Sequence, residues 1–231
     1  ILSPLIWRAG LRRFRRAPRP GLQLLRVGLS TLETALFFWA LAGLPLAEGM
    51  TYYMAGPVYV ALLSPLVLGE RVGARRWVLV AAGFAGVLLA LRPSPETLTV
   101  PALCAVGGSL CYAAFLVATR KLAGTPGTVL MAGQLAAAGV FGAALVAWQG
   151  WAPLGWRDGA LMVVLGAGSL GGNLCVNRAL RLAPASVVVP FQYTLILWGV
   201  LFGWLAFGDV PDGLTLLGAA VIVGAGLALL R

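Results

Sequence analysis

Histidine is absent from this chain of 231 residues, and only seven side chains are acidic against 17 basic ones. General acid–base catalysis and most metal sites depend on His, Asp, Glu and Cys, so the composition offers little material for either. The three cysteines, Cys104, Cys111 and Cys175, are odd in number and lie in apolar stretches, which argues against a disulfide framework. We therefore expect neither a metal nor a cofactor.

Charge of either sign is scarce as well. Charged residues make up 10% of the chain, whereas about 25% is usual for a soluble domain. Apolar residues make up 60%, and the mean hydropathy is +0.93. Such a chain has too little polar surface to cover a globule in water, which excludes a soluble enzyme, a secreted disulfide scaffold and a disordered regulator. The remaining class is a polytopic membrane protein.

Long apolar runs predict an all-α fold, because a membrane-spanning helix needs about 20 mostly apolar residues. The runs are continuous and do not alternate with polar residues. The connections between them are short and leave no room for a domain outside the membrane. We predict eight spans, at 26–44, 49–68, 76–92, 99–119, 127–148, 158–180, 185–207 and 213–230.

The charges between these spans predict the orientation of the chain. Alternating sides place 15 basic residues on one side of the membrane and two on the other, while five of the seven carboxylates fall on the side poor in Arg. By the positive-inside rule, the basic side is cytoplasmic and the C-terminus lies there. Segment 8–26 alone holds seven Arg. We interpret it as a cytoplasmic loop that sets the topology; binding of nucleic acid or of anionic lipid is the weaker alternative, and we expect no nucleic-acid partner.

An internal repeat relates the two halves of the chain. Residues 40–92 align with residues 179–231 at a constant offset of 139, without a gap. The alignment brings every predicted helix boundary into register. Each copy would hold five helices, an odd number, so the two copies must run in opposite directions across the membrane, as inverted repeats of secondary transporters do. The offset places the start of the first copy about 40 residues before Ile1, so we expect this copy to lack one or two N-terminal helices.

Two stretches make the repeat recognisable. Both resemble repeats of EamA-type transporters of the drug/metabolite transporter superfamily. The stretch that resembles the first repeat is ALAGLPLAEGMTYYMAGPVYVALLSPLVLGERVGARRWVLVAAGFAGVLLALRP, and the stretch that resembles the second is ALRLAPASVVVPFQYTLILWGVLFGWLAFGDVPDGLTLLGAAVIVGAGLALLR. The resemblance implies a 5+5 inverted-repeat bundle in the bacterial inner membrane, with repeats at 1–92 and 99–231. It implies transport of small organic solutes, such as amino acids or related metabolites, by alternating access.

Glu33 is the carboxylate placed well inside a predicted span. An ionisable group in a span costs about 2.5–3.5 kcal/mol on insertion scales, so it usually faces a cavity or a partner. We interpret Glu33 as a proton-coupling or cation-recognition group of the solute pathway. The alternatives are a structural hydrogen bond to a neighbouring helix and a side chain that extends toward the cytoplasm.

Further polar side chains inside the spans are candidates for the same pathway. Asn173 and Asn177 lie one helical turn apart, on one face, and either line the pathway or join two helices. Gln192 and Tyr193 follow Pro190, which interrupts a helix and frees a backbone carbonyl.

Tyr52 and Tyr53 lie at the repeat positions that match 191 and 192, so the two repeats place polar groups at the same depth. An aromatic belt at the membrane surface is the alternative for both. Tyr112 lies in the middle of a predicted span, where a belt position is less favoured.

Two features that could suggest an enzyme are weaker evidence than the repeat. The segment GAGSLG at 166–171 matches a dinucleotide-binding fingerprint, but it lies inside a span and follows no strand, so helix packing explains it better. A membrane-embedded enzyme would need several ionisable groups within the spans, and Glu33 alone qualifies. The sequence therefore predicts a secondary transporter rather than an enzyme, with a second copy of the chain as a candidate partner. A truncated chain without activity of its own is the further alternative.

Overall fold

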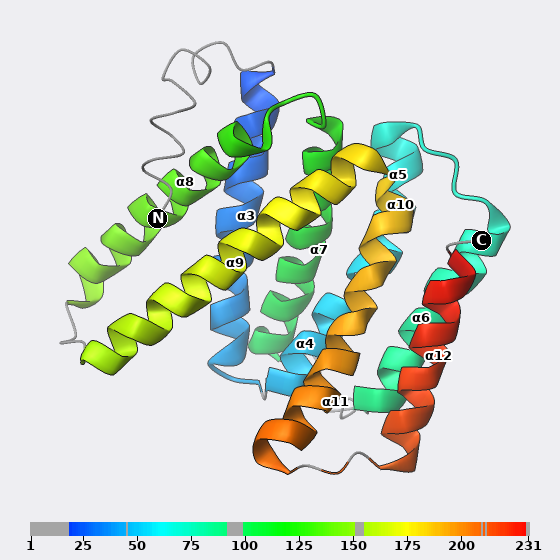
Figure 1. Cartoon of the computed structure of the whole chain (residues 1–231). Helices are drawn as coiled ribbons and strands as arrows, with labels where there is room; N and C mark the ends of the chain where they lie inside the picture. The colour runs from blue at the N-terminus through cyan, green and yellow to red at the C-terminus, as the bar shows by residue number, and fades with distance from the viewer. Residues whose placement is uncertain are drawn as a thin grey trace. The chain divides into compact units, whose positions relative to one another are not determined.

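The computed structural model describes residues 19–44, 46–91, 99–150, 155–208, 210 and 212–229, and within these residues the regular elements are all helical (Figure 1). The expected all-α fold is confirmed. The elements are α3 (Pro20–Leu41), α4 (Leu46–Met54), α5 (Gly56–Leu68), α6 (Ala74–Leu91), α7 (Val100–Lys121), α8 (Gly127–Gln149), α9 (Trp156–Leu182), α10 (Ala185–Val188), the 3₁₀ helix η1 (Val189–Tyr193), α11 (Thr194–Phe207) and α12 (Gly213–Leu229).

The eight predicted apolar stretches all coincide with helices. Six segments are long and apolar enough to cross a membrane by length and composition: Pro20–Leu41, Gly49–Leu68, Val100–Lys121, Gly127–Trp148, Trp156–Leu182 and Ala185–Phe202. A shorter apolar helix covers Gly213–Ala228. Because these helices expose many large apolar side chains, among them Leu66 and Val164, the fold suits a lipid environment.

The start of the first described helix corrects the sequence interpretation. We expected segment 8–26 to be a loop, but α3 begins at Pro20, where the ring's fixed φ fits the first helical turn. Arg26 therefore lies in a helix, with a side chain that is fully buried. Its interpretation as a loop charge is wrong. Residues 8–18, which hold five of the seven Arg, lie outside the described residues.

The chain divides into two compact units. Unit 1 comprises Ile1–Thr31 and Ala118–Leu182, and unit 2 comprises Leu32–Val117 and Ala183–Arg231. Each unit thus takes segments from both halves of the sequence. The units therefore differ from the two repeats, which the alignment places one after the other along the chain.

In unit 2 both repeats break a predicted span at the same position. In the first repeat the turn residue Ala55 separates α4 from α5, and in the second the 3₁₀ helix η1 passes directly into α11 at Thr194. These two residues are related by the repeat offset of 139. Pro190 lies within the 3₁₀ turn, as expected from its missing N–H, and Pro57 opens α5. The predicted spans 49–68 and 185–207 therefore each depart from a continuous α-helix, at a turn residue in the first repeat and at a 3₁₀ turn in the second.

Helices α6 and α12, which are equivalent in the two repeats, pack against each other (Figure 1). Their backbones meet at Gly86 and Gly218: a Cβ atom on Gly218 would lie 2.6 Å from the carbonyl oxygen of Gly86. The two helices can approach this closely because neither residue has a side chain.

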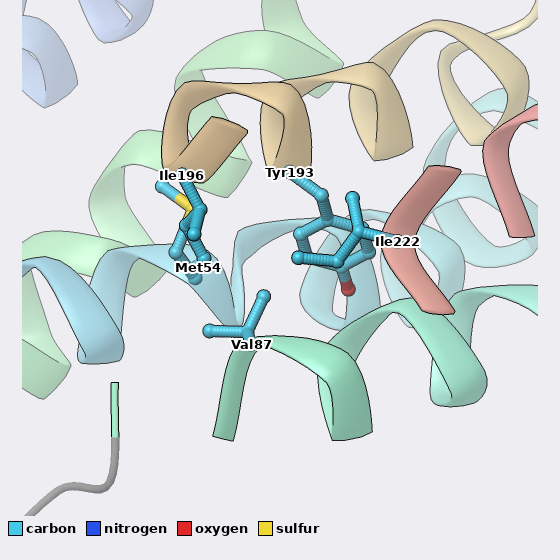
Figure 2. Close-up of a cluster of buried hydrophobic side chains, with 5 residues drawn as sticks. All are labelled: Met54, Val87, Tyr193, Ile196 and Ile222. Atoms are coloured by element: carbon cyan, nitrogen blue, oxygen red, sulfur yellow. The ribbon is translucent and has the colours of Figure 1, made fainter. Parts of the chain in front are cut away.

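A buried cluster beside this contact joins five elements of unit 2. Figure 2 shows Met54, Val87, Tyr193, Ile196 and Ile222 converging from α4, α6, η1, α11 and α12. The hydroxyl of Tyr193 donates a hydrogen bond of 3.3 Å to the carbonyl oxygen of Val80, which satisfies its one buried polar group. The cluster holds the broken helix of the second repeat against α6 and α12.

The LGERVG segment also has a structural role in unit 2. Gly69 ends α5 with a φ of 68°, a left-handed conformation that favours glycine. The carboxylate of Glu70 accepts a hydrogen bond of 3.4 Å from the backbone N–H of Ala185, and Arg76 donates one of 3.4 Å to the hydroxyl of Ser186. The loop of the first repeat thereby holds the first turn of α10 in the second repeat.

Candidate functional site

A cavity of about 220 Å³ lies within unit 2, beside both helix breaks. Four of the predicted site residues line it, one from each of four elements: Glu33 on α3, Tyr53 on α4, Tyr112 on α7 and Gln192 on η1. The other lining residues are apolar, namely Phe37, Met50, Met54 and Leu195. A cavity with apolar walls and a few convergent polar groups is the usual form of a small-molecule site.

The internal repeat explains why two of these polar groups meet. Tyr53 and Gln192 occupy equivalent positions, 139 residues apart, and each precedes the break in its own repeat by two residues. The structure brings both side chains to one cavity. Sequence symmetry thus predicted the pairing of these two positions.

Aromatic rings form one wall of the cavity. The rings of Phe37 and Tyr53 meet edge to face, with centroids 5.0 Å apart and an interplanar angle of 78°. The ring of Tyr112 follows, 6.2 Å from that of Tyr53, and Phe115 stacks behind it at 6.2 Å. Rings in such pairs hold each other in place, so the wall presents flat apolar surfaces in fixed orientations.

Hydrogen bonds orient the polar groups of the site. The amide of Gln192 donates to the hydroxyl of Tyr112, which joins η1 to α7. The hydroxyl of Tyr53 donates to the backbone carbonyl of Glu33 at 3.3 Å. The Glu33 carboxylate accepts a bond of 3.3 Å from Thr34 on its own helix. A carboxylate and an amide carbonyl beside aromatic faces can bind a flat solute that carries N–H or O–H donors or a positive charge.

Gly108, which the sequence reasoning missed, makes room for this arrangement. A Cβ atom at this position would collide with the hydroxyl of Tyr53 and would lie 3.4 Å from the Cβ of Leu36. Glycine therefore lets α7 approach both α3 and the Tyr53 ring. The sequence signal was the pair Gly107–Gly108 within a span, but such pairs are common in a chain with 31 glycines.

The structure does not bring the other predicted residues of unit 2 to this cavity. Tyr52 is half-buried and is not among the residues that line it. Tyr193 is 3% exposed and points into the packed cluster of Figure 2, although it directly follows Gln192.

In unit 1 the two asparagines have different surroundings. Asn173 donates to the carbonyl oxygen of Ser169 on its own helix at 3.0 Å. Asn177 is buried; its oxygen accepts a bond of 3.4 Å from Arg26, and its nitrogen donates one of 3.1 Å to the sulfur of Met131. Of the two hypotheses for Asn177, the contacts favour a hydrogen bond between helices.

Arg26 is the centre of this second polar group, and the sequence analysis missed it. Its guanidinium donates to the hydroxyl of Thr119 at 2.7 Å, to the carbonyl of Leu130 at 3.2 Å, to Gln134 at 3.1 Å and to Asn177. We call Arg26, Thr119, Gln134 and Asn177, with the Leu130 carbonyl, the Arg26 cluster. The signal was an Arg set in the apolar run LLRVGL, which we had assigned to the preceding loop.

Metal binding has little support in the part of the chain that the structure describes, since it holds no group of three or more His, Cys, Asp or Glu side chains. Cys104, Cys111 and Cys175 are free thiols there.

Comparison with known proteins shows which family this chain resembles. The model of the EamA-like transporter family matches residues 1–92 and 99–231. A riboflavin transporter of Vibrio cholerae is 32% identical over 228 residues, covering 96% of this chain and 76% of the relative. The pseudopaline exporter CntI of Pseudomonas aeruginosa is 30% identical over 210 residues, covering 90% of this chain and 74% of the relative.

A solved crystal structure has the same fold, with a TM-score of 0.81 at 21% identity, over 96% of this chain and 79% of that one. The family match, the two relatives and the apolar helices agree with one another. The chain belongs to the EamA-like transporter family of the drug/metabolite transporter superfamily, and it is a multi-pass membrane protein that transports small solutes and is not an enzyme.

Proposed function

We propose that the cavity of unit 2 binds the transported solute, and that this solute is a flat, ring-bearing metabolite with several hydrogen-bond donors. Transport proceeds by alternating access across the bacterial inner membrane, with the C-terminus in the cytoplasm. Glu33, Tyr53, Tyr112 and Gln192 are the residues that contact the solute. The convergence of a carboxylate and an amide beside a row of aromatic rings carries the proposal.

The chemistry of the walls favours a ring over an aliphatic amino acid. Tyr53 and Tyr112 offer aromatic faces for stacking, while the Met50 and Met54 side chains adapt to irregular apolar shapes. A zwitterionic amino acid would place its carboxylate against these walls, and the described residues that line the cavity include no Lys or Arg to pair with it. The lining therefore matches an uncharged or cationic ring.

The cavity's size defines how much of a solute it encloses in this conformation. Pockets that hold a drug-sized ligand measure about 300–1,000 Å³, and this cavity measures about 220 Å³. It therefore has room for a ring system, with the remainder of a vitamin-sized solute outside it. Riboflavin, which one relative at 32% identity is named for, combines an aromatic ring system with a polyol chain. Flavins are the first class to test.

Uptake of labelled riboflavin into proteoliposomes that contain the chain tests the proposal. We expect saturable uptake that unlabelled flavins inhibit and a panel of amino acids does not. Gln192→Leu removes the bond to Tyr112 and the amide that would contact the solute. It should raise KM by about tenfold, since a hydrogen bond in a binding site is worth about 1 kcal/mol. Tyr193→Phe is the matched control, because Tyr193 packs away from the cavity.

Two results of this experiment would contradict the proposal. Inhibition by amino acids but not by flavins would assign the site to amino acids, as the family resemblance first suggested. Absence of uptake with every solute in the panel, from correctly folded protein, would support a chain without independent activity.

Glu33 is the group that we propose for coupling transport to protons. Glu33→Gln should leave insertion intact and abolish the dependence of uptake on a pH gradient, while exchange of solute at equal concentrations continues. Loss of exchange as well would assign Glu33 to solute binding. An unchanged dependence on the gradient would leave the carboxylate with a structural role.

Thiol labelling tests the proposed orientation. Single cysteines placed at Gly155 should react with a membrane-impermeant reagent in intact cells. Those placed at Gly73 and Gly124 should react only after the membrane is opened. The reverse pattern would place the C-terminus outside the cytoplasm.

A further inference from the structure

Arg26 is buried among four helices, and its hydrogen bonds join all of them. Its Nε donates to Thr119 on α7, its Nη1 to Leu130 on α8, and its Nη2 to Gln134 on α8 and Asn177 on α9. In these bonds the N–H groups of the planar guanidinium donate to oxygen atoms of the protein itself. The cluster is therefore a connection between helices and not an open site for a solute.

The shortest of these bonds joins α3 to α7 within unit 1. Arg26 lies near the start of α3 and Thr119 near the end of α7, so the two helices are antiparallel where they meet. Seven residues further along α3 is Glu33, and seven residues back along α7 is Tyr112. Because seven residues are almost two turns, or about 10.5 Å, each pair lies on one face of its helix.

Arg19, directly before α3, donates a longer bond of 3.5 Å to the carbonyl of Lys121 at the end of α7, and nearer the cavity the contact between the two helices is less specific. Where α3 contacts α7 near the cavity, Leu36 lies over Gly107 and Gly108, and Cβ atoms at these glycines would be 3.5 Å and 3.4 Å from it. Glycines present no side chains that interlock with a neighbouring helix, so this contact permits close approach but does little to specify register. A directional bond to a fully buried guanidinium does specify it.

From this register we propose that Arg26 and Thr119 are positioning residues: their hydrogen bond fixes α3 against α7 and thereby places the Glu33 carboxylate opposite Tyr112 in the cavity. The proposal rests on the proposed function of that cavity. It assigns to Arg26 a role in solute affinity without contact with the solute.

Thr119→Val tests the pair, because valine has the shape of threonine but cannot accept the bond. Thr119→Ser restores an acceptor and is the conservative rescue. Thr31→Val is the matched control on α3, since the Thr31 hydroxyl bonds the carbonyl of Val27 on its own helix. All are made in the full chain, in proteoliposomes, with riboflavin as the probe.

We expect Thr119→Val to raise KM for riboflavin by about tenfold, because displacing a positioned group by about 1 Å costs up to about 10²-fold. The maximal rate per folded molecule should stay within about twofold. Thr119→Ser should return KM to the starting value, and Thr31→Val should leave it unchanged. A Thr119→Val variant with unchanged KM, whatever its melting temperature, would overturn the proposal and leave the cluster a structural role.

A second measurement needs no solute and separates this proposal from that of the cavity's function. Hydrogen exchange in Thr119→Val should rise in the segments 32–41 and 100–112 and stay unchanged in α6 and α12. If the chain fails to transport riboflavin, this rise still supports the register function of the pair. Exchange that stays unchanged in those two segments would overturn it.

Discussion

Helix α3 contributes to two polar groups of opposite design. Arg26 lies in a cluster where each partner oxygen belongs to the protein, and its side chain is fully buried. Glu33 lines a cavity of about 220 Å³, where its carboxylate accepts a bond from its neighbour Thr34. The comparison shows how to distinguish a charged side chain that holds helices together from one that binds a solute, when both lie inside the protein. A closed cluster stabilises helices, and an open one leaves hydrogen-bonding capacity for a solute.

The largest expected effect distinguishes the two charged groups directly. Arg26→Leu leaves several buried oxygens without their donor, so it should lower the free energy of unfolding by about 3 kcal/mol or more. Glu33→Leu should change it by less than about 1 kcal/mol, since the cavity can admit water or close, but should abolish transport. Thermal unfolding of both variants in the same detergent measures this. Equal losses of stability would remove the distinction between the two groups.

Asn177→Leu should produce the next largest effect. It removes an acceptor of Arg26 and a donor to Met131, so we expect a loss of about 1–2 kcal/mol of stability. Asn173→Leu is the matched variant on the same helix, one turn earlier, and should cost less than about 0.5 kcal/mol because it loses only a bond within α9. A larger loss at Asn173 than at Asn177 would contradict the assignment of the cluster.

Tyr112→Phe tests the cavity side of the comparison. It removes the hydroxyl that accepts from Gln192 and retains the ring, so stability should fall by no more than about 1 kcal/mol. KM for the solute should rise severalfold, because Gln192 then loses the bond that orients its amide. Stability and uptake measured on the same preparation separate the two effects. A large loss of stability with unchanged KM would identify the Gln192–Tyr112 bond as structural.

The smallest expected effect on stability is that of Gly108→Ala, since alanine favours a helix by about 1 kcal/mol over glycine while the new methyl displaces the Tyr53 hydroxyl. The two terms largely cancel in stability, but displacement of Tyr53 should reduce solute affinity. Gly107→Ala is the control, as its Cβ would lie 3.5 Å from Leu36, an ordinary contact. Equal affinities in the two variants would show that the position of Tyr53 does not matter for binding.

The helices and half of the site were predictable because they depend on local pattern and on the repeat. Apolar runs located each helix, Pro190 located a break, and the offset of 139 paired Tyr53 with Gln192. The environment of Arg26 was not predictable from the sequence in the same way. Its partners lie 93 to 151 residues away, on three other helices, and an arginine near a helix start usually extends toward the membrane surface.

Tyr193 shows a second limit of the sequence argument. Gln192 and Tyr193 are adjacent and polar, and both follow Pro190, so the sequence treats them alike. In a 3₁₀ turn, neighbouring side chains point about 120° apart. Gln192 therefore lies in the cavity, while Tyr193 packs against Gly83, whose missing side chain leaves room for the ring. The direction of each side chain follows from the backbone of the break, which a hydropathy pattern does not encode.

The contact between Gly86 and Gly218 has a mechanical consequence. It joins helices that the inverted repeat makes equivalent, although the two glycines are not equivalent positions, since the offset of 139 pairs Gly86 with Ala225. Because two bare backbones meet there, no side chains have to disengage if α6 and α12 shift along each other, whereas a methyl group added at either glycine would force the helices apart.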